Sequence, residues 1–112
     1  MKKIEAIIRP ERLSEVRIAL EAAGCPGLMV TEIEGYGKQK GIVEQWRGET
    51  YRVSLLTKTK IEMVVNDDQV KTLVKVLTEA ARTGEIGDGK IFIYPIEEAI
   101  QIRTGATGKD AI

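Results

Sequence analysis

The amino-acid sequence predicts an α+β domain built from two consecutive β-α-β units. One observation is an internal repeat: a shift of 57 positions places residues 4–8 on residues 61–65, and the match continues into the stretches that follow. The other is the alternation of β-type runs with segments of helical period. Two such units form a ferredoxin-like sandwich, one antiparallel sheet with both helices on one face. Coincidence is the alternative, but the Lys-Ile-Glu at both strand starts favours duplication.

The first unit has a strand, a helix and a second strand. The strand is expected at residues 4–8, and the helix starts at Pro10, because proline suits the first helical turn. Glycine commonly follows a helix end, so the helix should stop at Gly24. Residues 28–35 then alternate in the manner of a strand.

The second unit repeats this order after a long loop. Its strand covers residues 61–65, and its helix starts near Asn66, a residue type that caps helices well. The helix should end before Thr83. The last strand is expected at residues 90–94, where Pro95 stops it.

The two faces of the predicted sheet differ in polarity. The apolar face should lie under the helices and carries Ile4, Ala6, Ile8, Ile61, Met63 and Val65. The opposite face is only half apolar, because it carries Glu5, Ile7, Glu62 and Val64. Self-association would remove this apolar surface from water, and a terminal segment folded over it is the alternative.

Composition limits the classes of function. The 112 residues fit one domain, residues 1–112, and 17 Lys and Arg balance 17 Asp and Glu, which argues against a nucleic-acid partner. Histidine is absent, so catalysis by Ser-His-Asp or Cys-His groups is excluded. The single Cys25 cannot form an internal disulfide. No apolar run reaches a membrane span and no secretory signal is recognised, so a cytoplasmic protein is expected.

Residues 83–90 form a glycine-rich segment with a lysine at its end. Glycines at positions 84, 87 and 89 allow backbone N–H groups to face an anion, and Lys90 adds a positive charge. The spacing resembles a P-loop, but Ile91 replaces the magnesium-binding hydroxyl and the segment leads from a helix into a strand. An anion cradle is favoured over a plain turn, and Arg103 belongs to a second cationic stretch.

A loop of about 20 residues, 37–57, has no helical period, and long loops of this kind are often functional. It contains Trp46, Arg47 and Tyr51, residue types that dominate protein interfaces. A partner-binding loop is favoured, and a self-packed β-hairpin is the alternative. Its base combines glycines with Lys38 and Lys40, which together with Lys58 form either an anion site or a solvated basic patch. By spacing alone, Glu62 is an ordinary strand glutamate.

Three segments resemble the PII nitrogen-regulatory proteins of the GlnB/GlnK type. Residues 83–96 resemble the family's C-terminal signature, residues 35–41 the junction to its T-loop, and residues 46–51 the T-loop itself. The resemblance covers essentially the whole chain and implies a T-loop at about 37–57, a B-loop at about 82–90 and a C-terminal loop at about 101–112.

The resemblance implies a cytoplasmic homotrimer that senses Mg-ATP, ADP and 2-oxoglutarate in clefts between subunits. The B-loop would hold the phosphates, and Arg103 would reach them from the neighbouring subunit. The implied nucleotide-binding residues are Ile7, Met29, Gly35, Gly37, Lys38, Gln39, Glu62, Val64, Gly87, Asp88, Gly89, Lys90 and Arg103. Those implied for 2-oxoglutarate are Gln39, Lys40, Gly41, Lys58, Ile86 and Gly87, with Gln39 also a ligand of the magnesium ion.

The resemblance also implies an output. The T-loop would dock on a membrane ammonium transporter, with Arg47 inserted into its cytoplasmic mouth and Trp46 and Tyr51 in contact, so the protein would associate reversibly with the membrane. Nitrogen-assimilation enzymes are further implied targets. Tyr51 matches a position that some members have uridylylated.

Some residues depart from the family's pattern. Gln101 replaces a second phosphate-binding arginine, so nucleotide affinity or ATP-over-ADP preference would be weakened. Met29 replaces a threonine and loses its hydroxyl contact, and Lys38 replaces an arginine, which exchanges a bidentate fork for a point charge. Trp46, Glu49 and Thr50 change the surroundings of Tyr51 and hence its recognition by a modifying enzyme.

Two other function classes share the predicted fold. An RNA-binding module needs aromatic residues on the sheet face, and the last strand offers one Phe in a chain of zero net charge. A nucleotide hydrolase needs a base that activates water, and none is evident. The sensor interpretation therefore leads, and the protein is expected not to be an enzyme.

Overall fold

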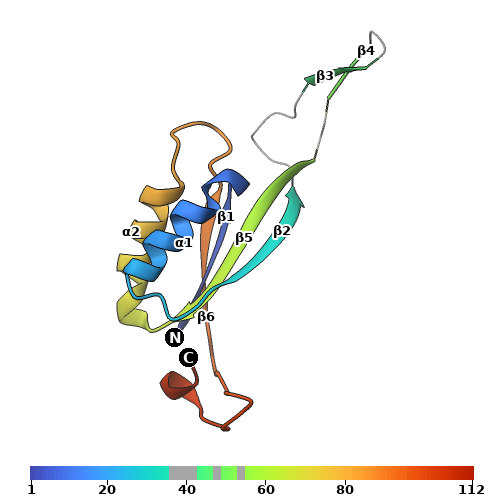
Figure 1. Cartoon of the computed structure of the whole chain (residues 1–112). Coiled ribbons are helices and arrows are strands. Elements are labelled where there is room, and N and C mark those ends of the chain that lie inside the picture. Colours follow the sequence, from blue (N-terminus) through green and yellow to red (C-terminus); the bar gives the residue numbers. More distant parts are fainter. Residues whose placement is uncertain (36–42, 47–48, 53–54) are drawn as a thin grey trace.

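The computed structural model describes residues 1–35, 43–46, 49–52 and 55–112 (Figure 1). In chain order the elements are β1 (Lys2–Ile8), the 3-10 helix η1 (Pro10–Arg12), α1 (Leu13–Ala22), β2 (Met29–Gly35), β3 (Val43–Trp46), β4 (Glu49–Arg52), β5 (Leu56–Val65), α2 (Asp67–Ala81), β6 (Lys90–Pro95) and the 3-10 helix η2 (Gly108–Ala111).

The four long strands form one antiparallel sheet in the order β2-β5-β1-β6, and both α-helices cover one of its faces (Figure 1). This arrangement confirms the predicted ferredoxin-like α+β fold. The central pair β1 and β5 places Glu5 opposite Glu62. The β1–β6 pair places Ile7 opposite Lys90, so the end of β1 lies beside the start of β6.

The element boundaries differ from the prediction in a few places. Pro10 starts a 3-10 turn, and the α-helix begins only at Leu13, because Arg9 is extended and the chain must first turn away from β1. The strand predicted from Leu28 begins at Met29. Thr57, which was assigned to the end of the long loop, is the second residue of β5, since the β2–β5 pairing extends to Leu56.

The core lies between the sheet and the helices. Alternate residues of β1 and β5 are buried there, which confirms the assignment of the apolar face: Ile4, Ala6, Ile8, Ile61, Met63 and Val65. The helices contribute Val16, Leu20, Leu73, Leu77 and Ala81. Aliphatic side chains at alternate strand positions and at helical spacing thus account for the layer order.

The opposite sheet face carries a network of charges. The Lys3 ammonium lies 3.9 Å from the Glu5 carboxylate and 3.8 Å from that of Glu62, while Lys60 lies 3.2 Å from Glu62. The hydroxyl of Tyr94 donates to Glu5 at 3.0 Å, and this bond raises the pKa of the tyrosine. No described helix covers this face.

The segment between β2 and β5 contains the hairpin β3–β4, a separate two-stranded antiparallel sheet. Figure 1 shows this hairpin beyond the ends of β2 and β5, away from the helices. The backbone of this segment thus forms a β-hairpin, and the role of the segment in partner binding stays a prediction. Within the described residues, no helix is long and apolar enough to cross a membrane.

Candidate functional site

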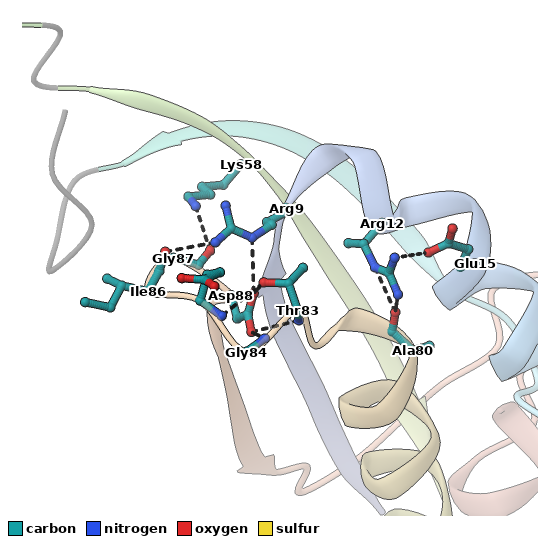
Figure 2. Close-up of polar contacts among 11 residues, drawn as sticks. Arg9, Arg12, Glu15, Lys58, Ala80, Thr83, Gly84, Ile86, Gly87 and Asp88 are labelled. Carbon is teal, nitrogen blue, oxygen red and sulfur yellow. Dashed lines mark hydrogen bonds and ion pairs between the residues drawn. The ribbon is translucent and has the colours of Figure 1, made fainter. Parts of the chain in front are cut away.

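The candidate site lies at the end of the sheet where β1 stops and β6 begins. There the loop between α2 and β6, residues 82–89, meets Arg9 from the end of β1 and Lys58 from β5 (Figure 2). Strand pairing brings these residues together. Because β5 and β6 both run antiparallel to β1, the start of β5 and the start of β6 lie at the same end of the sheet as the end of β1.

Three glycines shape the loop. Gly84, Gly87 and Gly89 have φ angles of 92°, 106° and 101°, values that residues with a side chain rarely adopt. At Gly89 the space is also closed, because a Cβ atom there would lie 1.6 Å from the carbonyl oxygen of Ile7. The glycine pattern therefore reflects backbone geometry, and at Gly89 also a close approach to β1.

Asp88 closes the loop on itself. Its carboxylate accepts hydrogen bonds from the N–H groups of Thr83 at 2.9 Å and Gly84 at 2.8 Å, from the Thr83 hydroxyl, and from Nε of Arg9 at 3.1 Å. The bond from the Thr83 hydroxyl, together with the other donors, holds the pKa of Asp88 well below its ordinary value. The carboxylate is thus committed to the loop and to Arg9.

Two cations bind consecutive carbonyl groups of the loop. Nη2 of Arg9 donates to the carbonyl oxygen of Ile86 at 2.8 Å, and Nζ of Lys58 donates to that of Gly87 at 2.9 Å. Partial burial, followed by repulsion from Arg9, lowers the pKa of Lys58. The exposed Lys90 begins β6 directly after the loop. Glycine amides and several cations at one edge make this region suited to an anionic ligand.

A second group of predicted residues lies on the open sheet face. Met29 pairs with Glu62 in the β2–β5 register, and Gly35 ends β2 opposite Leu56. A shallow cavity of about 320 Å³ is lined by Pro26, Gly27, Leu28, Met29, Glu62, Met63, Val64 and Ile112. Three residues expected on the adenine and ribose side, Met29, Glu62 and Val64, therefore share one cavity.

Other predicted residues are not brought together within one chain. The C-terminal segment, which contains Arg103, lies at the opposite end of the sheet from the loop 82–89 (Figure 1). Trp46 is the last residue of β3, and Tyr51 lies in β4. The predictions for Gly37, Lys38, Gln39, Lys40, Gly41 and Arg47 lie outside the described residues.

Sequence reasoning missed Arg9 and gave Thr83 no role of its own. The signal for Arg9 was available, since an antiparallel β1–β6 pair with Ile7 opposite Lys90 places the residues after Ile7 beside those before Lys90. Thr83 donates to a residue five positions later, a contact that depends on the loop's glycine geometry.

In the described part of the chain, no three His, Cys, Asp or Glu side chains are grouped to hold a metal ion. The predicted magnesium ligand, Gln39, lies outside this part.

Fold and site together define a class: small ferredoxin-like proteins with a glycine-rich, cation-flanked loop at one end of the sheet. The family model for the nitrogen regulatory protein P-II matches residues 1–106. The chain belongs to the P-II family, whose members are named nitrogen regulatory proteins.

Several curated relatives align along the whole chain. Nitrogen regulatory protein P-II 2 of Methanothermobacter thermautotrophicus is 59% identical over 112 residues, which is 100% of this chain and 97% of the relative. Nitrogen regulatory protein P-II of Cereibacter sphaeroides is 58% identical and that of Nostoc punctiforme 55%, each over 100% of both chains.

Proposed function

We propose that this chain is a cytoplasmic signal transducer that binds ATP or ADP and 2-oxoglutarate and regulates a target, such as an ammonium transporter, through its T-loop. The observation that carries the proposal is the geometry of residues 83–90 in a P-II family member. Three features of this segment suit a phosphate-bearing ligand. Its glycines have positive φ angles, two cations bind its carbonyl groups, and the exposed Lys90 follows it.

The nucleotide is proposed to extend from this loop along the open sheet face. Lys90 would bind phosphate, and the N–H groups around Gly87, Asp88 and Gly89 would line its path. Ile7 pairs with Lys90 and so joins the loop to the open face. On that face Met29, Gly35, Glu62 and Val64 would contact the base and ribose, with Gly37, Lys38 and Gln39 at the phosphate end.

The position of Arg103 supports a nucleotide site that is shared between subunits. This residue belongs to the C-terminal segment, which lies far from the loop of its own chain, and its neighbour Ile102 is 100% exposed. A fully exposed isoleucine beside an arginine fits contact with another copy of the chain. We propose that three copies assemble with their open sheet faces inward, so that Arg103 of one subunit completes the phosphate site of the next.

The second effector is proposed to bind next to the nucleotide. A dicarboxylate beside a triphosphate is tolerable only if cations offset the repulsion. Two cations would offset this repulsion: a magnesium ion, held by Gln39 and by ligand oxygens, and the Lys58 ammonium. Lys40, Gly41, Ile86 and Gly87 would supply backbone groups. Lys58 already contacts Gly87.

The output is proposed to pass through the hairpin β3–β4 and its tip. Trp46 ends β3, Tyr51 lies in β4, and Arg47 follows Trp46 in the sequence. The T-loop would dock on a membrane ammonium transporter, and nitrogen-assimilation enzymes are further candidate targets. Membrane association would be reversible because it depends on the transporter.

A calorimetric titration of the intact protein with Mg-ATP and with ADP, with and without 2-oxoglutarate, tests the proposal. We expect Mg-ATP to bind and 2-oxoglutarate to bind only when Mg-ATP is present. Lys90→Ala should weaken ATP binding by roughly ten- to a hundred-fold, since a charge-assisted contact contributes about 1.5–3 kcal/mol. Lys75→Ala, at an exposed position of α2, is the matched control.

Two outcomes would overturn the proposal. One is equal ATP affinity of the parent and Lys90→Ala, which would make the glycine-rich segment a structural turn. The other is steady release of phosphate at catalytic rates, which would favour a nucleotide hydrolase.

A further inference from the structure

The connection between β1 and α1 carries two arginines that both reach across to the α2–β6 segment (Figure 2). Arg9 binds Asp88 and the carbonyl oxygen of Ile86. Arg12 donates from Nε at 3.1 Å and Nη2 at 2.7 Å to the carbonyl oxygen of Ala80, and pairs with Glu15 at 2.7 Å. One arginine thus holds the glycine-rich loop, and the other holds the end of the helix before it.

Arg9 and Lys58 fix the orientation of two successive peptide groups. In a trans peptide the C=O and the following N–H point in opposite directions. Because Arg9 binds the Ile86 carbonyl, the N–H of Gly87 points away from Arg9. Because Lys58 binds the Gly87 carbonyl, the N–H of Asp88 points away from Lys58. Among the described residues, no oxygen accepts a hydrogen bond from either N–H.

We propose that Arg9 is a positioning residue of the anion site: through Asp88 and the Ile86 carbonyl it holds the loop so that the Gly87 and Asp88 amides face a phosphate. The inference rests on the proposed nucleotide site and deepens it. The Arg9 side chain is only 15% exposed, and its Nε and Nη2 are both engaged by the loop. Through these two groups Arg9 acts on the loop.

The reason for such a residue is conformational entropy. A loop with three glycines has many accessible backbone states, and binding must select one of them. A planar guanidinium that bonds a carboxylate and a carbonyl at once restricts the loop before the ligand arrives. Preorganisation of this kind raises affinity without a new contact to the ligand.

Binding of Mg-ATP to the intact protein tests this, with Arg9→Ala, Arg9→Lys and the matched control Arg12→Ala. We expect Arg9→Ala to weaken ATP binding about ten-fold, the scale typical of residues that orient a binding group. Arg9→Lys should recover part of the loss, since an ammonium group cannot span both partners. Arg12→Ala should lower the thermal midpoint but leave ATP affinity unchanged, because Arg12 holds α2 and not the loop.

A double-mutant cycle separates positioning from direct contact. If Arg9 acts through Asp88, then Arg9→Ala should cost little further affinity in an Asp88→Ala background. The same cost in both backgrounds would show that Arg9 does not act through Asp88, and would overturn the inference.

Hydrogen exchange without ligand gives a second readout. The amides of Thr83 and Gly84, both bonded to Asp88, should exchange faster in Arg9→Ala than in the parent. If the parent binds ATP and Arg9→Ala binds it equally well, this inference fails while the proposed function stands. If the parent binds no ATP, the proposed function fails, and unchanged exchange in Arg9→Ala would overturn the loop-ordering role as well.

Discussion

At the scale of single residues, Gly89 combines two separate constraints. Its φ of 101° disfavours any side chain, and the Ile7 carbonyl occupies the space where a Cβ would lie. Gly84 has the first constraint without the second, because nothing lies within 4 Å of its Cβ position. Gly27 has neither.

We therefore predict a graded series of alanine variants. Gly27→Ala should leave the free energy of unfolding nearly unchanged, and Gly84→Ala should lower it by about 1–2 kcal/mol through backbone strain. Gly89→Ala should lower it further, because the start of the β1–β6 pair must shift. Urea unfolding of the three variants measures this order. Equal effects of Gly84→Ala and Gly89→Ala would show that the close approach to Ile7 is unimportant.

Asp88 makes a prediction about pH. Its pKa in the folded protein lies below the ordinary value, so the unfolded chain takes up the proton first as the pH falls. The stabilisation is complete well above pH ~4 and is lost as the pH drops below it. We expect the difference in urea midpoint between the parent and Asp88→Asn to shrink between pH 6 and pH 3 (about the range of carboxyl titration). A difference independent of pH would contradict this role.

Part of this site could be predicted from residue types that are adjacent in the sequence. The remaining part depends on contacts between residues that are far apart in the sequence. The three glycines and Lys90 could be found in the sequence because they are adjacent in it. The role of Asp88 could not, because it depends on donors from Thr83 and from Arg9, 79 positions away. Asp88 lies within the glycine-rich segment that was predicted to hold an anion. Its carboxylate, however, is used for hydrogen bonds to that segment and to Arg9.

At the scale of elements, the hydrophobic pattern predicted the order of strands and helices because each strand has a buried and an open face. The boundaries were less predictable. The turn at Pro10 is a 3-10 helix, since the chain must leave β1 before α1 can pack. The start of β5 at Leu56 depends on pairing with β2, which no local pattern contains.

The hairpin β3–β4 is the element proposed to carry the output, and Arg47 follows its first strand in the sequence. We predict that Arg47→Ala abolishes inhibition of ammonium transport while ATP affinity stays unchanged, because Arg47 is not among the residues proposed to bind the nucleotide. Arg52→Ala, at the end of β4, is a control on the same hairpin. Transport assays in transporter-containing membranes, with parent and variants added, make the measurement. Full inhibition by Arg47→Ala would rule out this arginine as the blocking group.

At the scale of the whole molecule, the open sheet face and the exposed C-terminal segment both favour assembly. The face carries Lys3, Glu5 and Tyr94 in one bonded network, with Ile7 and Val64 beside them. Charged groups that satisfy one another can be buried between subunits at lower cost than isolated ones.

We predict that the protein sediments as a trimer, with three times the 12.4 kDa of one chain. Ile102→Glu should weaken the assembly and leave the fold of each chain intact, because Ile102 is fully exposed in the single chain. Analytical ultracentrifugation and circular dichroism of both proteins make the comparison. A monomeric parent at micromolar concentration would contradict both the trimer and a site shared between subunits.

The pairing of β1 with β5 has a consequence for symmetry. The repeat relates Glu5 to Glu62, and in the sheet these same two residues lie opposite each other. Ile4 pairs with Met63, the counterpart of Ala6, and Ala6 pairs with Ile61, the counterpart of Ile4. The two halves are therefore related by a pseudo-twofold axis that passes between the two glutamates, as in a dimer of half-chains.

The same axis relates the tethers at the two helix ends. Arg12 and Gln69 are equivalent in the repeat, and each donates to a carbonyl at the end of the other half's helix, Arg12 to Ala80 and Gln69 to Gly24 at 3.4 Å. One half uses a charged fork at the end of α2, and the other uses a neutral amide at the turn after α1. The two halves thus share the position of this tether and differ in its chemistry.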